Sequence, residues 1–213
     1  MKQQSAENAP GSRRGRPRKG DDEKNRKRVV DAAFAELIER GYKGVTMLGI
    51  ASRAGASKET LYSWFGNREG LFAALIQENA DRSARRIELA LQGDDDPTAT
   101  LTAYATGMLT LLTDQRSIAL NRAAMNSPDL ARVLLTSGRH RVGSVVEQYL
   151  AMLSDAGHIH VTDPPAAFRL LYGLVMHDTQ IGVLLGEPPP SKSEIDARAS
   201  EAIARFMQLT QAK

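Results

Sequence analysis

Hydrophobic residues recur along most of this chain at the three- and four-residue spacing of an amphipathic helix. In the segment that begins at Glu23, this spacing is followed by Val30, Ala33, Phe34, Leu37 and Ile38, and Gly41 predicts the end of the helix. Two short helices are predicted over 46–54 and 58–64, joined around Gly55. A long helix is then predicted over 68–92.

A capping residue followed by a proline predicts the start of three later helices, at Asp96-Pro97, Ser127-Pro128 and Asp163-Pro164. The side-chain oxygen can accept from a free N–H at the helix start, where proline has no N–H to leave unpaired. We expect helices over 97–113, 115–126, 128–155, 164–185 and 193–211, the last with Ser193 as its cap and Asp196 at its third position. Residues 158–161 could be extended but are too few to build a sheet, so the predicted fold class is all-α.

Charge is distributed unevenly along the chain. Residues 1–72 hold 15 Lys and Arg against 9 Asp and Glu, whereas residues 73–213 hold 13 against 16. This asymmetry favours a polyanion-binding module attached to a separate body, with a basic tail that only aids solubility as the alternative.

The composition excludes several classes of chemistry and location. The chain has no cysteine, which rules out disulfides, thiolate zinc sites and cysteine nucleophiles. No apolar run reaches the ~18 residues of a membrane span, and the charged N-terminus lacks the apolar region of a secretion signal. We therefore expect a cytoplasmic protein that does not enter a membrane.

The segment from Thr46 to Phe65 is the most informative part of the sequence. Thr46 and Ser57 can each cap a short helix, and Gly55 permits the tight turn between the two helices. Ile50, Leu61 and Phe65 point toward a core, which leaves the polar and aromatic residues of the second helix on its other faces. This pattern predicts a helix-turn-helix, whose second helix lies in the major groove of DNA.

From Thr46 to Leu71 the sequence resembles the TetR family of transcriptional regulators. The matching residues are Thr46, Ile50, Ala51, Ala54, Gly55, Ser57, Thr60, Leu61, Tyr62, Phe65, Glu69 and Leu71. The segment from Pro128 to Gly186 also resembles the C-terminal domain of AefR-like members of that family. Composition predicts a disordered basic arm over 1–22, and the helical pattern predicts a three-helix unit over 23–66 and a helical body over 67–213. The resemblance implies that the unit binds DNA and that the body binds a ligand and dimerises.

The resemblance also implies which residues contact DNA. Thr46 and the hydroxyl of Tyr62 would bind phosphates, and Arg68 would bind a phosphate at the positive start of its helix. The residues expected at the groove are Ser57, Lys58, Thr60, Tyr62 and Trp64. Trp64 stands where the family has Tyr or His, and Glu59 where a small residue is common. Glu59 could accept from a cytosine amino group or face solvent and repel phosphate.

The arm contains Arg13-Arg14-Gly15-Arg16-Pro17, which resembles the core of an AT-hook. Gly15 allows close approach of the backbone, and Arg14 and Arg16 could enter an A·T-rich minor groove. The alternative is a basic tail that adds only non-specific, salt-dependent attraction.

The body is expected to form a homodimer through helices 164–185 and 193–211, with double-stranded operator DNA as the other partner. One stripe comprises Phe168, Leu171, Tyr172, Val175 and Met176, and the other comprises Ile195, Ala199, Ala202, Ile203 and Phe206. The alternative is that both stripes close the core of one chain.

The resemblance further implies a pocket for a small-molecule effector between the body helices. The candidate lining residues are Tyr104, Met108, Leu112, Met125, Tyr149, Met152, Met176 and His177. Methionine adapts to irregular ligands, although at helical spacing it is also ordinary core. The pair His177-Asp178 could recognise a polar ligand group or form a charged pair at the dimer interface.

These observations predict a repressor that leaves its operator when a small molecule binds the body. A ligand-independent DNA-binding or architectural protein is the alternative. An enzyme is not expected, because the sequence has no Gly-rich phosphate loop, nucleophile elbow or His-Glu-x-x-His motif. Neither a cofactor nor a metal site is expected, since His158 and His160 would supply only two ligands.

Overall fold

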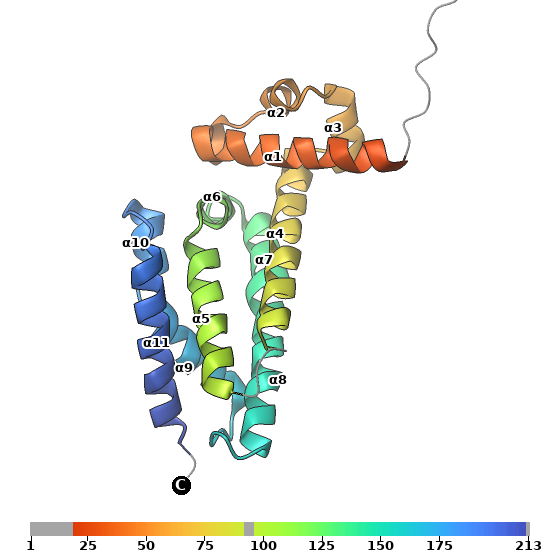
Figure 1. The fold of residues 1–213 in the computed structure, drawn as a ribbon. Coiled ribbons are helices and arrows are strands. Elements are labelled where there is room, and N and C mark those ends of the chain that lie inside the picture. Colours follow the sequence, from red (N-terminus) through yellow and green to blue (C-terminus); the bar gives the residue numbers. More distant parts are fainter. Residues whose placement is uncertain (1–18, 92–95, 212–213) are drawn as a thin grey trace, which may run out of the picture.

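The computed structural model describes residues 19–91 and 96–211, and within these ranges the regular structure is helical with no strand. Three helices form a head at one end of the molecule: α1 (Lys19–Gly44), α2 (Met47–Ala54) and α3 (Lys58–Phe65). The long helix α4 (Arg68–Leu91) leaves this head and runs down into the body (Figure 1). The all-α fold class is confirmed.

The turns of the head follow the local chemistry that the sequence predicts. Thr46 Oγ1 accepts from the N–H of Gly49 at 3.0 Å, and Ser57 Oγ accepts from the N–H of Thr60 at 3.1 Å. Gly55 adopts a left-handed conformation, with φ of 61°, between α2 and α3. Gly41, with φ of 65°, interrupts the regular helix of α1 where the sequence predicts its end.

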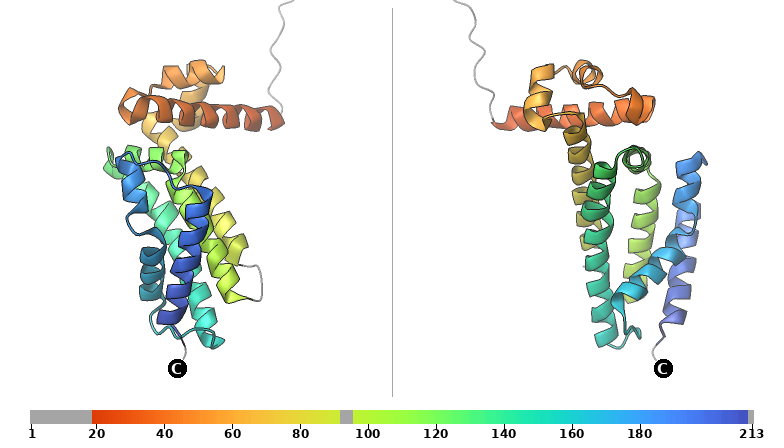
Figure 2. Two further views of the ribbon diagram at one scale, coloured as in Figure 1. Left: turned by 60° about the vertical axis from the view of Figure 1, so that its left-hand side comes forward. Right: turned by 180° about the vertical axis from the view of Figure 1, so that it is seen from behind.

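The body is a bundle of further helices (Figures 1 and 2). Its elements are α5 (Pro97–Thr113), α6 (Gln115–Ala124), α7 (Pro128–Leu134), the π-helical η1 (Leu135–His140), α8 (Arg141–Asp155), α9 (Pro164–Met176), α10 (Thr179–Leu185) and α11 (Lys192–Leu209). Asp96, Ser127 and Asp163 each cap the helix that starts at the following proline, as predicted. Helix α6 crosses the top of the body beneath α1 (Figure 1).

Two buried apolar clusters hold the molecule together. The first joins α1, α2 and α3 to the upper half of α4, from Leu71 to Ile76, and to α6 and α7 through Leu120 and Leu130. The second joins the lower half of α4 to α5, α8, α9 and α11. The core of the head therefore continues past residue 66 into the body, and α4 belongs to both clusters.

Three predicted helix boundaries in the body are wrong. The segment 128–155 contains the π-helical stretch Leu135–His140, and the segment 164–185 is broken at His177, whose φ is 44°. Helix α11 is capped by Ser191 rather than Ser193, because Glu194 completes a reciprocal capping box with Ser191. Asp196 instead pairs with Lys192 at 2.5 Å.

Two predictions concern the ends of regular structure. Residues 158–161 form no strand, and the N–H of His160 donates to the carbonyl of Thr210 at 2.6 Å, which attaches this loop to the end of α11. Helix α1 starts at Lys19, so the last four residues of the predicted arm are helical. Arg14 and Arg16 lie outside the described residues. Among the described helices, none combines the length and apolar character needed to cross a bilayer.

Candidate nucleic-acid interface and body cavity

Helix α3 presents one buried and several exposed faces. Leu61 and Phe65 enter the first cluster, while Lys58, Glu59, Tyr62 and Ser63 are exposed and Thr60 is half-buried. The predicted groove residues thus lie on α3 or, for Ser57, at its N-cap, and Leu61 and Phe65 are the buried side chains of this helix. Its exposed face matches the geometry of a recognition helix, in which side chains reach base edges and phosphates.

Hydroxyl groups gather at this surface. Ser57 Oγ and Thr60 Oγ1 are 3.0 Å apart at the start of α3. Tyr62 is 43% exposed, and Lys58 Nζ lies 5.5 Å from the centroid of its ring. Among the described residues the Tyr62 hydroxyl has no hydrogen-bond partner, so it is available to donate to a phosphate.

Glu59 is held at the first turn of α3. Hydrogen bonds from its own backbone N–H and from the Ser57 hydroxyl lower the pKa of its carboxyl group. The carboxylate is therefore charged at neutral pH and would repel a phosphate at this helix start, which favours the solvent-facing alternative.

Arg68 has a structural role that the sequence did not indicate. Its Nη1 donates to the carbonyls of Tyr42 at 3.2 Å and Val45 at 3.5 Å, and its guanidinium carbon lies 4.4 Å from the centroid of the Tyr42 ring. Arg68 thus satisfies one carbonyl group in the last turn of α1 and one just after its end. One guanidinium joins the start of α4 to the end of α1, in addition to any contact with DNA.

Trp64 is half-buried rather than free at the groove. Its ring packs edge-on against Phe65 with 6.3 Å between centroids, and it contacts the first cluster. This packing leaves only part of the indole to face a ligand.

A charged network that sequence reasoning missed joins α1 to α2. Glu36 is only 3% exposed, and its carboxylate pairs with Arg53 and Arg40, each at 2.9 Å. Arg53 also binds Glu39, and this hydrogen bond lowers the pKa of the Glu39 carboxyl group. A buried carboxylate needs such partners, so the network fixes α2 against α1. Only the i, i+4 pair of Glu36 and Arg40 carries a sequence signal.

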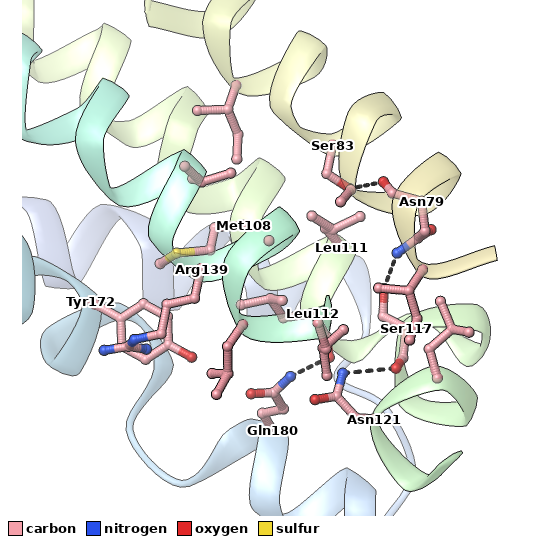
Figure 3. Close-up of a pocket in the computed structure, with 18 of the residues that line it drawn as sticks. Asn79, Ser83, Met108, Leu111, Leu112, Ser117, Asn121, Arg139, Tyr172 and Gln180 are labelled. Carbon is pink, nitrogen blue, oxygen red and sulfur yellow. Dashed lines mark hydrogen bonds between the residues drawn. The ribbon is translucent and has the colours of Figure 1, made fainter. Parts of the chain in front are cut away.

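The body contains a cavity of about 280 Å³, which is lined by residues of every helix from α4 to α10, η1 included (Figure 3). Its lining is largely apolar with a few polar groups, which is typical of small-molecule sites. Of the predicted residues, Tyr104, Met108 and Leu112 line it.

The other five predicted ligand residues lie elsewhere. Met125 and Met152 are 71% and 54% exposed, and Tyr149 and Met176 are buried in the second cluster. His177 lines a separate groove between α10 and α11. Three of the four methionines predicted to line the pocket therefore lie at the surface or in the core. A methionine in the sequence does not reveal which helix faces meet around a cavity.

Sequence reasoning missed most of the polar lining. These residues are Asn79, Ser83, Ser117, Asn121, Arg139, Tyr172 and Gln180. Asn79 Nδ2 donates to Ser117 Oγ at 3.4 Å, and Ser83 Oγ donates to the Asn79 carbonyl at 2.6 Å (Figure 3). The available signal was that Asn79 and Ser83 interrupt the apolar face of α4 one turn apart.

The two stripes predicted for the dimer interface are inside the chain. Leu171, Val175, Ala199, Ile203 and Phe206 are each 0% exposed in the second cluster. These residues close the core of one chain, as the alternative held, so a dimer would use other faces of the same helices. Within the described residues, no group of three or more His, Asp or Glu side chains is placed to hold a metal ion.

Two family models match this arrangement of head and body. Residues 29–75 match the bacterial regulatory proteins of the tetR family, and residues 99–209 match the AefR-like transcriptional repressor C-terminal domain. The chain belongs to the TetR family of transcriptional regulators. Both parts of the resemblance seen in the sequence are confirmed.

Individual relatives agree with the family. An uncharacterised HTH-type regulator of Bacillus subtilis, YdeS, is 43% identical over 68 residues. The matched segment covers 32% of this chain and 31% of YdeS. The HTH-type transcriptional repressor ComR of Escherichia coli is 28% identical over 153 residues, 68% of this chain and 71% of ComR. A solved TetR regulator from Agrobacterium tumefaciens is 32% identical with a TM-score of 0.71, covering 88% of this chain and 94% of that one.

Proposed function

We propose that this TetR-family regulator represses transcription by binding an operator as a homodimer, and that a small molecule in the body cavity releases it. The observation that carries this proposal is that two helices are shared between the head and the cavity. Helix α4 contributes Leu71 and Leu75 to the core of the head, and Asn79, Ser83 and Ile87 to the cavity wall.

Helix α6 makes the second connection. Arg116 on α6 pairs with Asp31 of α1 at 2.9 Å, and its guanidinium carbon lies 4.6 Å from the centroid of the Phe34 ring. The adjacent residues Ser117 and Leu120 line the cavity. A ligand that moves α6 or α4 would thus move α1 and the recognition helix. The ligand must bind the two arrangements with different affinities, since equal binding shifts nothing.

The DNA contacts follow from the exposed surface of the head. We propose that Ser57, Lys58, Thr60 and the exposed edge of Trp64 lie at the major groove, while Thr46, Tyr62 and Arg68 hold phosphates. A two-fold dimer would place two such helices about 34 Å apart, one turn of DNA. The similarity to ComR, a transcriptional repressor, supports repression rather than activation. Because a regulator must reach the chromosome, we place the protein in the cytoplasm.

The test begins with selection of an operator from random duplexes by the full-length protein. A metabolite library is then screened for a rise in melting temperature, which ligand binding to the folded state produces. Compounds that stabilise the protein should release it from the operator in a mobility-shift assay. Weak sequence preference together with no stabilising compound would instead indicate the ligand-independent DNA-binding alternative.

A further inference from the structure

Arg139 lines the cavity and is also exposed to solvent. It lies in the π-helical stretch between α7 and α8, and its guanidinium carbon is 4.3 Å from the centroid of the Tyr172 ring (Figure 3). In the described part of the chain it forms no ion pair, and none of the residues that line the cavity is acidic. The cavity therefore has one cation without a counter-charge.

In the described part of the chain the Arg139 guanidinium lies over the Tyr172 ring and donates no hydrogen bond, so its N–H groups are available to a ligand. The N–H donors of a guanidinium point outward in its plane. That edge matches the two oxygens of a carboxylate. π-Helical turns are rare overall, but those that occur often lie at functional sites. The π-helical stretch that positions Arg139 in the cavity wall agrees with such a role.

A second donor in the cavity lacks a strong acceptor. Tyr104 is 1% exposed, and within residues 19–91 and 96–211 its hydroxyl donates only to the sulfur of Met108, at 3.3 Å. A thioether is a weak acceptor. Burial raises the pKa of Tyr104, which keeps the phenol protonated and able to donate at neutral pH. Tyr104, Tyr172 and Arg139 all line this cavity.

The remainder of the cavity suits an uncharged hydrocarbon. Ile76, Ile87, Leu111 and Leu112 supply apolar wall, and the polar groups Asn79, Ser117 and Asn121 lie at the side away from Arg139 (Figure 3). These last three are neutral and are hydrogen-bonded to protein. Charge is thus recognised at one end only.

We propose that the effector is an amphipathic monocarboxylate. Its carboxylate is held edge-on by Arg139 and accepts from the Tyr104 hydroxyl, and its hydrocarbon part lies along the apolar wall toward α6. This inference rests on the proposed function, because it names the class of molecule that fills the same cavity.

The test measures binding of decanoate and of decan-1-ol to the full-length protein by calorimetry. These probes share a chain and differ in charge. Arg139 is exposed at the cavity wall, whereas Tyr104 is buried. Loss of a charge-assisted hydrogen bond predicts that Arg139→Gln lowers the affinity for decanoate, relative to that for decanol, by about tenfold. Tyr104→Phe should lower the same ratio by less. Arg132→Gln is the matched control, because Arg132 is exposed on α7, outside the cavity; it should leave the ratio unchanged.

Circular dichroism melts confirm that each variant folds. A ratio that is the same in the wild type and in Arg139→Gln overturns the inference, as does failure of decanoate to bind the wild type. If decanol alone binds and releases the operator, the inference fails and the proposed function stands. If decanoate binds through Arg139 but operator binding is unchanged at saturating decanoate, the carboxylate site is supported. Release of the operator by decanoate is then refuted.

Discussion

The arginine at the first position of α4 has a structural role in addition to the phosphate contact proposed for it. Arg68 is placed where a helix start favours phosphate, and its side chain also satisfies the carbonyls of Tyr42 and Val45. The second role comes from residues more than twenty positions earlier, so only the fold reveals it. A loss of DNA binding on mutation of Arg68 would thus have two possible causes.

Two substitutions separate these causes. Arg68→Ala removes both the charge and the hydrogen bonds to the carbonyls, and we expect it to lower the free energy of unfolding by about 1–2 kcal/mol because backbone acceptors lose their partner. Arg68→Lys keeps a cation but cannot reproduce the stacked, forked geometry. It should lose stability while keeping most of its operator affinity. Urea denaturation and mobility shifts measure the two quantities, and equal stability of all three proteins would contradict the structural role.

Tyr62 provides the complementary case at the same surface. Its hydroxyl has no hydrogen-bond partner in the described chain, so Tyr62→Phe should leave the unfolding free energy within about 0.5 kcal/mol of wild type. Operator affinity should fall about tenfold, because the variant cannot donate a hydrogen bond to a charged phosphate. Fluorescence anisotropy with a labelled operator checks the affinity. Ser63→Ala, on the same exposed helix but not among the predicted DNA-binding residues, is the control. An affinity unchanged in Tyr62→Phe would refute the phosphate contact.

At the scale of elements, the contact between α3 and α4 depends on one glycine. A Cβ atom at Gly70 would lie 2.1 Å from the carbonyl oxygen of Phe65, which is backbone and cannot turn away. Gly70→Ala should therefore displace the recognition helix from α4, with a loss of about 2 kcal/mol or more in stability. Thermal melts and operator binding measure the two effects.

Gly107→Ala is the matched control for this prediction. Gly107 lies inside α5, and a Cβ there meets nothing within 4 Å. Alanine favours helix over glycine, so this variant should gain about 0.5–1 kcal/mol. If Gly70→Ala were as stable as Gly107→Ala, the close approach of α3 to α4 would be contradicted.

Much of this element scale could be predicted from sequence, because the signals are local. The caps at Thr46, Ser57 and Asp96 involve residues two or three positions apart. The break at His177 was not predicted, because a positive φ is uncommon at any non-glycine residue. The cavity lining was also missed, since Asn79 and Ser117 meet only when α4 and α6 pack together.

At the scale of the whole molecule, variants of the N-terminal arm distinguish non-specific attraction to phosphates from arginine binding in the minor groove. Deleting residues 1–18 should reduce the slope of log affinity against log salt by about 0.9 for each phosphate that the arm neutralises in the intact protein. A double variant with Arg14→Lys and Arg16→Lys keeps the charge. If the arginines enter a minor groove, this variant should keep the slope but lose preference for A·T-rich flanks. An unchanged slope after deletion would show that the arm does not touch DNA.

The proposed homodimer depends on surface that the single chain leaves apolar. On the helices proposed to pair, Leu170 of α9 and Ile181 and Leu185 of α10 are 40%, 60% and 84% exposed. A charge at the centre of a paired apolar surface is buried without a partner, so Ile181→Asp should convert the dimer to a monomer. Light scattering after gel filtration measures the mass.

Leu89→Asp is the control for this variant, because Leu89 is 69% exposed on α4, away from the proposed interface. It should remain dimeric and bind the operator normally. Ile181→Asp should bind an isolated half-site as the wild type does but lose affinity for the full operator, since two recognition helices no longer bind as one unit. If Ile181→Asp were dimeric, or if Leu89→Asp dissociated, the paired face would lie elsewhere, and the spacing of the two α3 helices would have to be set by another surface.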